Sequence, residues 1–247
     1  MTRRLHIILL SLLLIVAGYL VVEFTRGRGE THQITIIDIG NASRPEIGRL
    51  MREVAAQRPE IIGMDFFLVN DSLERDTVIA AAMDRYDRTI QVVALHRFNP
   101  DFYLWDSLEV SHSKFRPGGI GFANIFLKDS VLVNAVPMQQ IWNDSIIPAF
   151  GLAIARKIGR VDARYAEGGF EDLEFPVDRI GRNYNRLQLS DILSGDFKKV
   201  ELEGKIVLLG YLGPDDDIYY IDEDRNKRAS GVEIHAAILE EALDTPK

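Results

Sequence analysis

The sequence predicts an α/β fold in which a mainly parallel sheet is flanked by helices, with one transmembrane helix preceding the domain. Short apolar runs rich in β-branched residues recur along the chain, and stretches with helical spacing of apolar residues alternate with the first of them. Strands and helices that alternate over short links are typical of right-handed βαβ units, which build parallel sheets. The transmembrane helix is predicted from a charge-free apolar run over residues 7–22.

That N-terminal run is long enough to cross a bilayer. As a helix, residues 5–22 would extend over roughly 27 Å, close to the thickness of the hydrocarbon core. Arg3 and Arg4 precede the run, and the positive-inside rule places their side in the cytoplasm. Arg26 and Arg28 follow it and reduce the charge contrast. The sequence therefore predicts an anchored chain whose main domain lies outside the cytoplasm.

A cleaved signal peptide is the alternative interpretation of the same run. Such peptides usually have an apolar region of about 7–15 residues and a small-residue cleavage site, whereas this run is longer and no Ala-x-Ala follows it. Both interpretations export the rest of the chain. The expected division is a cytoplasmic N-terminus over 1–4, a signal anchor in contact with membrane lipid over 5–24, a linker over 25–33 and an extracytoplasmic domain over 34–247.

The composition limits the kinds of partner and site. The chain carries a formal net charge of −8, and phosphate contacts need clustered Lys and Arg, so we expect no nucleic-acid partner. The chain contains no cysteine, which excludes disulfides, thiolate metal sites and cysteine nucleophiles. The exported domain must then be stabilised by its core, for which a hydrophobic content of 47% is sufficient.

The first elements are the best marked. Residues 34–38 form a short buried strand, and Ser43 with Glu46 makes a capping-box pattern that begins a helix. Residues 61–65 form a second buried strand, which we expect to continue through residue 67. Another Asp/Glu capping pair, Asp71 and Glu74, precedes a second helix, whose apolar positions are Val78, Ile79, Ala82, Met83 and Tyr86.

The second half of the domain is less regular. A third strand over 90–95 precedes residues 99–119, a long irregular segment with several aromatic residues. These aromatic side chains suit a lid over a pocket, a dimer contact or a segment packed on the sheet, and the sequence leaves these alternatives open. Further along we expect strands over 120–122, 131–136 and 205–210, helices over 148–158, 190–193 and 231–243, and a polar excursion over 160–182.

Several short segments keep one order along the chain and together resemble a known family. They are residues 36–38, 61–67 with the following acidic stretch, 121–124, 190–193, 202–210 with an Asp in the next loop, and 231–236. This ordered set resembles the CHASE2 domain, an extracytoplasmic sensory module of bacterial signalling receptors. The resemblance implies a periplasm-facing domain held at the bacterial inner membrane.

The chain also departs from that family. The family usually has Thr-Pro shortly before the closing Gly, whereas residues 222–230 are charged and lack it, and no Arg occurs over 131–138. The family usually continues into transmembrane helices and a cytoplasmic output domain, whereas this sequence stops at Lys247. The resemblance therefore implies a sensor whose output is absent from this chain.

Two carboxylates end predicted parallel strands. Asp38 and Asp65 each follow an apolar run, and ligands of open α/β sheets bind at the carboxyl ends of strands. The pair suits a divalent cation, which prefers oxygen ligands, or a cationic or hydroxylated small molecule. Alternatively, each carboxylate caps the next turn or helix through backbone N–H groups.

Four further residues complete the candidate ligand site. Asn124 belongs to the family's Gly-x-x-Asn strand, and Asp215 and Asp217 lie in the acidic loop after the strand at 205–210. This loop is either a solvated turn or a cation site, since the calcium-loop spacing is absent. His235 lies one turn into the last helix, as a neutral imidazole bonded to backbone or as a ligand-binding or pH-sensing group.

No motif for catalysis or cofactor binding accompanies these residues. The sequence has no His-Glu-x-x-His, no Gly-x-Ser-x-Gly elbow, and neither the P-loop nor the dinucleotide-binding glycine pattern. We expect no enzyme activity, no resident metal and no cofactor. The predicted function is a membrane-anchored sensory domain for an unknown small molecule or ion, with homodimerisation possible. The alternative is an envelope dimerisation or assembly module that senses nothing.

Overall fold

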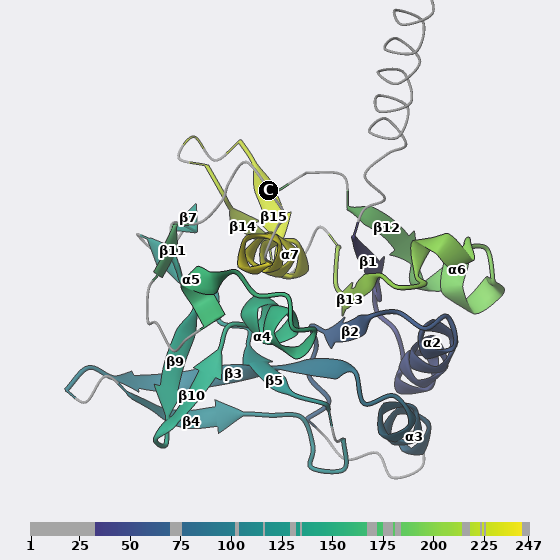
Figure 1. The fold of residues 1–247 in the computed structure, drawn as a ribbon, viewed down its shortest axis with the longest axis horizontal. Helices are drawn as coiled ribbons and strands as arrows, with labels where there is room; N and C mark the ends of the chain where they lie inside the picture. The colour runs from purple at the N-terminus through teal and green to yellow at the C-terminus, as the bar shows by residue number, and fades with distance from the viewer. Residues whose placement is uncertain are drawn as a thin grey trace, which may run out of the picture. The chain divides into compact units, whose positions relative to one another are not determined.

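A seven-stranded sheet forms the centre of the described part of the computed structural model (Figure 1). The structure describes residues 33–69, 76–101, 104–115, 117–128, 132–133, 135–166, 172–174, 180, 184–213, 218–222, 224 and 226–243. The predicted signal anchor over 5–24 lies outside these residues. Among the described residues, no helix is both long and apolar enough to span a membrane.

The sheet is mainly parallel, as predicted. Its strand order is β12-β1-β13-β2-β3-β4, and β5 also pairs with β3. Every pair is parallel except β3 with β4. In chain order the strands are β1 (Ile34–Asp38), β2 (Ile61–Met64), β3 (Thr89–Asn99), β4 (Leu104–Glu109), β5 (Ile120–Phe122), β12 (Asn185–Gln188) and β13 (Ile206–Gly210).

Helices cover both faces of the sheet. One face packs against α2 (Arg44–Ala56), α3 (Thr77–Arg85) and α6 (Leu189–Ser194), and the other against α4 (Phe150–Lys157) and α7 (Gly231–Ala242). The alternation of side chains along β1 divides the core between these faces, because Ile36 packs on the α4 and α7 side and Ile37 on the α2 side. Burial on both faces explains why the central strands are continuously apolar.

Smaller elements surround this sheet. The strands β9 (Gln139–Trp142) and β10 (Ser145–Pro148) form a hairpin, and β8 (Ala135–Pro137) pairs with β11 (Asp172–Glu174). A short turn of helix, α5 (Ala163–Ala166), and a 3-10 turn over Lys199–Glu201 lie between larger elements. A small sheet joins β6 (Leu127–Lys128), β7 (Leu132–Val133), β14 (Ile218–Tyr220) and β15 (Arg228–Ser230).

The structure corrects four sequence expectations. The second strand ends at Met64 and does not continue to residue 67. The segment over 99–119, expected to be irregular, contains β4, and the expected strand over 131–136 is represented by the separate short strands β7 and β8. The edge strand β12 was not predicted, because only Leu187 among its four residues is apolar and buried. The expected capping pair at residues 71 and 74 lies outside the described residues.

The aromatic residues of the segment over 99–119 are described in part. Trp105 contacts the rings of Phe98 and Phe126, with centroids 5.2 and 6.0 Å apart. Phe115 is buried in the core on the α2 and α3 side. These contacts support the interpretation in which aromatic side chains pack the segment onto the sheet.

Candidate functional site

The carboxyl ends of three adjacent parallel strands bring two predicted site residues to one edge. Asp38 on β1 is paired with Gly210 on β13, and Leu209 is paired with Met64 on β2. The Asp65 N–H donates to the Leu209 carbonyl at 2.8 Å, which continues that register by one residue. Gly210 therefore lies between the two aspartates, which are roughly 10 Å apart across two strand spacings.

By the alternation of side chains along a strand, Asp38 and Asp65 are both on the side of the sheet covered by α4 and α7, although Asp38 also borders a hollow lined by residues of α2 and α6. Asp38 lies two residues after Ile36 and therefore on the same face of the strand, and Ile36 packs in the core on that side. Asp65 lies two residues after Gly63 and therefore on the same face, and a Cβ added to Gly63 would lie 2.9 Å from Phe150 of α4. The sequence therefore predicted correctly that the two strand ends lie at one edge.

Asp38 organises the loops at this edge. Its Oδ1 accepts hydrogen bonds from the N–H of Gly40 at 2.9 Å and from the N–H of Leu212 at 3.1 Å. The first bond caps the turn after β1, as the capping interpretation expected, and the second holds the start of the loop after β13. Its Oδ2 makes no hydrogen bond to the described residues, so one oxygen remains for a ligand.

The N-terminal turn of α7 lies directly over β13. Ser230 and Glu233 form a capping box in which the Glu233 carboxylate accepts from the Ser230 N–H at 3.0 Å. A Cβ at Gly210 would lie 2.7 Å from Val232 Cβ, so only glycine permits this approach of helix to strand. Three residues later, on the same helix face, comes His235.

His235 and Asp65 face each other without a hydrogen bond. His235 Nε2 lies 3.9 Å from Asp65 Oδ1, beyond the usual 2.7–3.2 Å of a hydrogen bond. The two side chains are 4% and 10% exposed. Phe150 packs its ring edge-on against the imidazole, with centroids 5.4 Å apart.

The imidazole also contradicts one expectation. His235 Nδ1 is buried and has no hydrogen-bond partner among the described residues, so the expected bond to backbone is not formed. A buried polar atom without a partner costs about 1–3 kcal/mol. The His235 imidazole is therefore incompletely satisfied, and it lies at the edge where ligands of α/β sheets bind.

Asn124 has a different position and different partners. Its Oδ1 accepts from the Leu95 N–H at 2.8 Å, and its Nδ2 donates to the Leu95 carbonyl at 2.9 Å. These two bonds extend the β3–β5 pairing beyond Phe122, in the manner of a backbone peptide group. The side chain joins strands, and the structure does not bring it together with Asp38. Asp215 and Asp217 lie outside the described residues.

A shallow hollow of about 290 Å³ adjoins Asp38 at the ends of β1 and β12. Its lining includes Asp38, Gly40, Glu46, Gln188 and Ser190. The hydrogen bond from the Ser43 hydroxyl, and to a smaller extent that from the Ser43 N–H, hold the pKa of Glu46 below its ordinary value.

Within the described ranges, no three His, Cys, Asp or Glu side chains gather closely enough to hold a metal ion.

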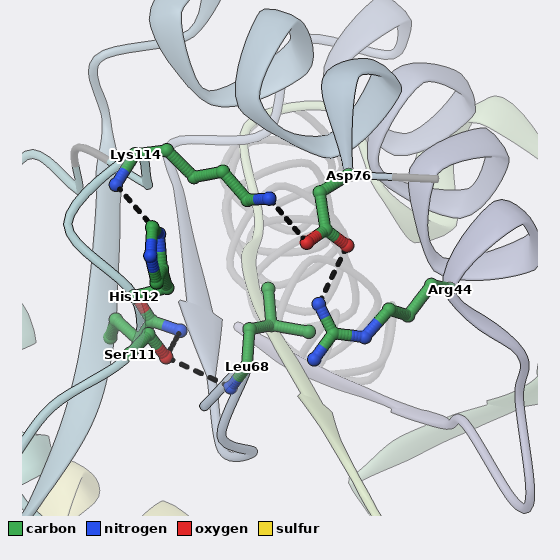
Figure 2. A network of polar contacts seen from close by, with 7 residues as sticks. Arg44, Leu68, Asp76, Ser111, His112 and Lys114 are labelled. Carbon is green, nitrogen blue, oxygen red and sulfur yellow. Dashed lines mark hydrogen bonds and ion pairs between the residues drawn. The ribbon is translucent and has the colours of Figure 1, made fainter. Parts of the chain in front are cut away.

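A second polar cluster, which sequence reasoning missed, lies on the opposite face (Figure 2). Asp76, the residue before α3, is fully buried. Its Oδ1 lies 2.6 Å from Arg44 Nη1 of α2, and its Oδ2 lies 2.6 Å from Lys114 Nζ. Arg44 and Lys114 are both distant from Asp76 in the sequence, so no local pattern marks the ion pairs. The one local signal was the position of Asp76 immediately before the apolar positions with helical spacing.

Neighbouring polar groups are satisfied as well. The Ser111 hydroxyl oxygen accepts from the Leu68 N–H at 3.0 Å and is 2.5 Å from the Gln91 amide nitrogen. The Lys114 N–H donates to His112 Nδ1 at 3.4 Å (Figure 2). The ion pairs of Asp76 with Arg44 and Lys114 therefore join α2, the start of α3 and residues 111–114 to one another.

The comparisons with known proteins bear on the chain as a whole. Comparison with curated proteins and with solved structures gives no match. A family model described as the CHASE2 domain matches residues 20–247, which is most of the chain and includes the whole sheet. The chain therefore belongs to the CHASE2 domain family, the extracytoplasmic sensory domains of signalling receptors.

Proposed function

We propose that this chain is a membrane-anchored, periplasm-facing sensory domain that binds a small molecule or ion where Asp65 and His235 face each other, at the same edge of the sheet as Asp38. The observation that carries the proposal is the buried His235 Nδ1, which has no hydrogen-bond partner among the described residues, on an imidazole whose Nε2 lies 3.9 Å from Asp65 Oδ1. A sensory domain needs polar groups that a ligand can satisfy, and the His235 imidazole offers one at an edge suited to ligands.

The chemistry of the site favours a ligand with hydrogen-bond donors. Asp38 and Asp65 supply carboxylate oxygens, and a neutral imidazole both donates and accepts. A hydroxyl or ammonium group between Asp65 and His235 would replace one long contact by two hydrogen bonds. The proposed ligand class is therefore a small amine or polyol, ahead of a bare ion.

The same geometry suggests how binding would be relayed. His235 belongs to α7, which approaches β13 through Val232 and packs on α4 through Gly151. A ligand that binds Asp65 and His235 together would draw α7 toward β2. We propose that this change in α7 carries the signal to an output domain, and that the domain catalyses no reaction itself.

A thermal-unfolding screen of the full chain in lipid nanodiscs tests the proposal. The probes are magnesium and calcium ions, short primary amines and diamines, and small polyols. A probe that binds the folded state should add about 2.7 kcal/mol to its unfolding free energy at a hundredfold excess over Kd.

Two variants make the screen specific. Asp65→Asn removes the charge in the buried pair, and Asp106→Asn removes one at an exposed position on β4. A stabilisation that survives in Asp106→Asn and disappears in Asp65→Asn supports the proposed site. If every active probe stabilises all three proteins equally, or if no probe acts, the proposed site is wrong.

A further inference from the structure

A groove separates α2 and α3 on the face of the sheet opposite α7. Its volume is about 690 Å³, within the roughly 300–1,000 Å³ that is usual for small-molecule sites. Its lining includes two alanines from the end of α2 and two from α3, together with Val78 and Tyr86. Asp38, Asp65 and His235 do not line it.

The sequence explains why the space between the helices is not filled. At one end, a Cβ added to Gly48 would lie 2.9 Å from Val78 Cγ1, so the two helices are in contact there. One and two turns further on, both helices present alanine to the gap: Ala55, Ala56, Ala81 and Ala82. Methyl groups are too short to meet across it, and a groove remains.

Both ends of the groove are fixed. At the N-terminal ends of the helices, Asp76 joins Arg44 of α2 to Lys114 (Figure 2). At the other end, the Tyr86 hydroxyl donates to the Pro59 carbonyl at 2.5 Å. These contacts hold α2 and α3 at both ends of the groove.

The charged groups in the lining are cationic. The lining contains Arg52 and Arg85 and no acidic residue, although the whole chain carries a formal net charge of −8. Arg52 is 3.3 Å from Glu53, and both side chains are well exposed; such pairs contribute little. Arg85 makes no hydrogen bond or ion pair to the described residues.

Tyr86 does not oppose an anion. Burial raises the pKa of Tyr86 to about 12, so the phenol is neutral at physiological pH. An apolar floor with two arginines at its margin is complementary to a molecule that has an apolar body and one negative group. Its volume fits a small molecule, whereas a protein partner would need a larger contact area.

From this complementarity we infer that the α2–α3 groove binds a small amphipathic monoanion, with its apolar body on the alanines and its carboxylate or sulfonate between Arg52 and Arg85. The site is separate from the sheet edge and does not depend on the proposed function.

Calorimetry with a matched pair of probes tests this site. The probes are naphthalene-2-sulfonate and its neutral analogue naphthalene-2-sulfonamide, titrated into the full chain in nanodiscs, with empty nanodiscs as the blank. The sulfonate should bind more tightly than the sulfonamide. In Arg52→Gln/Arg85→Gln, the sulfonate affinity should fall about tenfold, as expected for two exposed charged contacts, while the sulfonamide affinity is unchanged.

Two further variants separate the groove from general charge and folding effects. Arg49→Gln/Arg88→Gln removes the same charge from exposed positions outside the lining and should leave both affinities unchanged. Ala81→Trp fills the groove from an exposed position and should abolish binding of both probes without lowering the unfolding temperature. Equal binding of the two probes to the wild-type chain, equal losses in the two double variants, or no binding by the wild type would each overturn the inference.

Discussion

Two polar clusters, one on each side of the sheet, differ in how completely their groups are satisfied. Asp76 is fully buried and has a cation at 2.6 Å from each carboxylate oxygen. The Asp65–His235 pair is almost as buried, yet its atoms are 3.9 Å apart and His235 Nδ1 has no partner among the described residues. The comparison teaches that burial alone does not identify a structural ion pair, because Asp76 is paired through both carboxylate oxygens, whereas His235 keeps a buried nitrogen without a partner among the described residues.

Removing Asp76 should have the largest effect. Asp76→Ala would leave Arg44 and Lys114 without their anion, and breaking a buried pair from one side costs about 3–5 kcal/mol. Because both cations are partly exposed, we expect a loss near 3 kcal/mol in unfolding free energy, measured by urea denaturation. Glu53→Gln, which breaks an exposed pair, is the control and should cost less than about 0.5 kcal/mol. A loss below about 1 kcal/mol for Asp76→Ala would show that the cluster is not structural.

Changing the contact between α7 and β13 should have an intermediate effect. Gly210→Ala places a Cβ 2.7 Å from Val232 Cβ, and overpacking of this kind usually costs about 1–3 kcal/mol. Because α7 must then move away from β13, the variant should also lower the affinity for any ligand that binds Asp65 and His235 together. In a double variant with Val232→Ala, the loss in the same denaturation experiment should be smaller than the sum of the two single losses, because the shorter side chain makes room for the added Cβ. Strictly additive losses would show that this contact does not set the helix position.

Removing the unsatisfied imidazole should change stability little. His235→Leu deletes a buried nitrogen without a partner and keeps an apolar side chain against Phe150, so we expect a change within about 1 kcal/mol of zero. The same variant should lose the response to any probe that stabilises the wild-type chain. A loss of stability as large as that of Asp76→Ala would instead show that the His235–Asp65 pair stabilises the fold as the Asp76 cluster does.

The sequence predicted those parts of the fold that have a local pattern. β1, the capped helix α2, β13 and α7 were predicted because buried apolar runs, capping pairs and helical spacing all lie within a few residues. The edge strand β12 was not predicted, because a polar edge strand with one buried leucine has no such pattern. β4 escaped because its residues are mostly half-exposed and lie in a segment rich in turn residues.

The candidate sites follow the same rule. Asp38 and Asp65 became candidates because each directly follows an apolar run, and the parallel topology places the ends of the two strands at one edge of the sheet. The contact of Asp65 with His235 was not predicted, because it depends on how α7 crosses β13 at Gly210. The Asp76 cluster was missed because its partner Arg44 is 32 residues away, and nothing local marks the pairing.

The smallest effect concerns Glu46, a partly exposed carboxylate whose Oε2 accepts hydrogen bonds from Ser43. Hydrogen bonds from Ser43 lower the pKa of Glu46 in the folded chain, so its contribution to stability is present above the ordinary pKa and is lost as the pH falls through the lowered value. Glu46→Gln keeps an acceptor for the Ser43 N–H but cannot titrate. Stability measured between pH 6 and pH 3 should therefore fall slightly less in Glu46→Gln than in the wild type. If the two proteins lose the same stability over this range, the hydrogen bonds from Ser43 do not favour the charged form of Glu46. Hydrogen bonds at a poorly buried carboxylate would then contribute nothing measurable to the unfolding free energy.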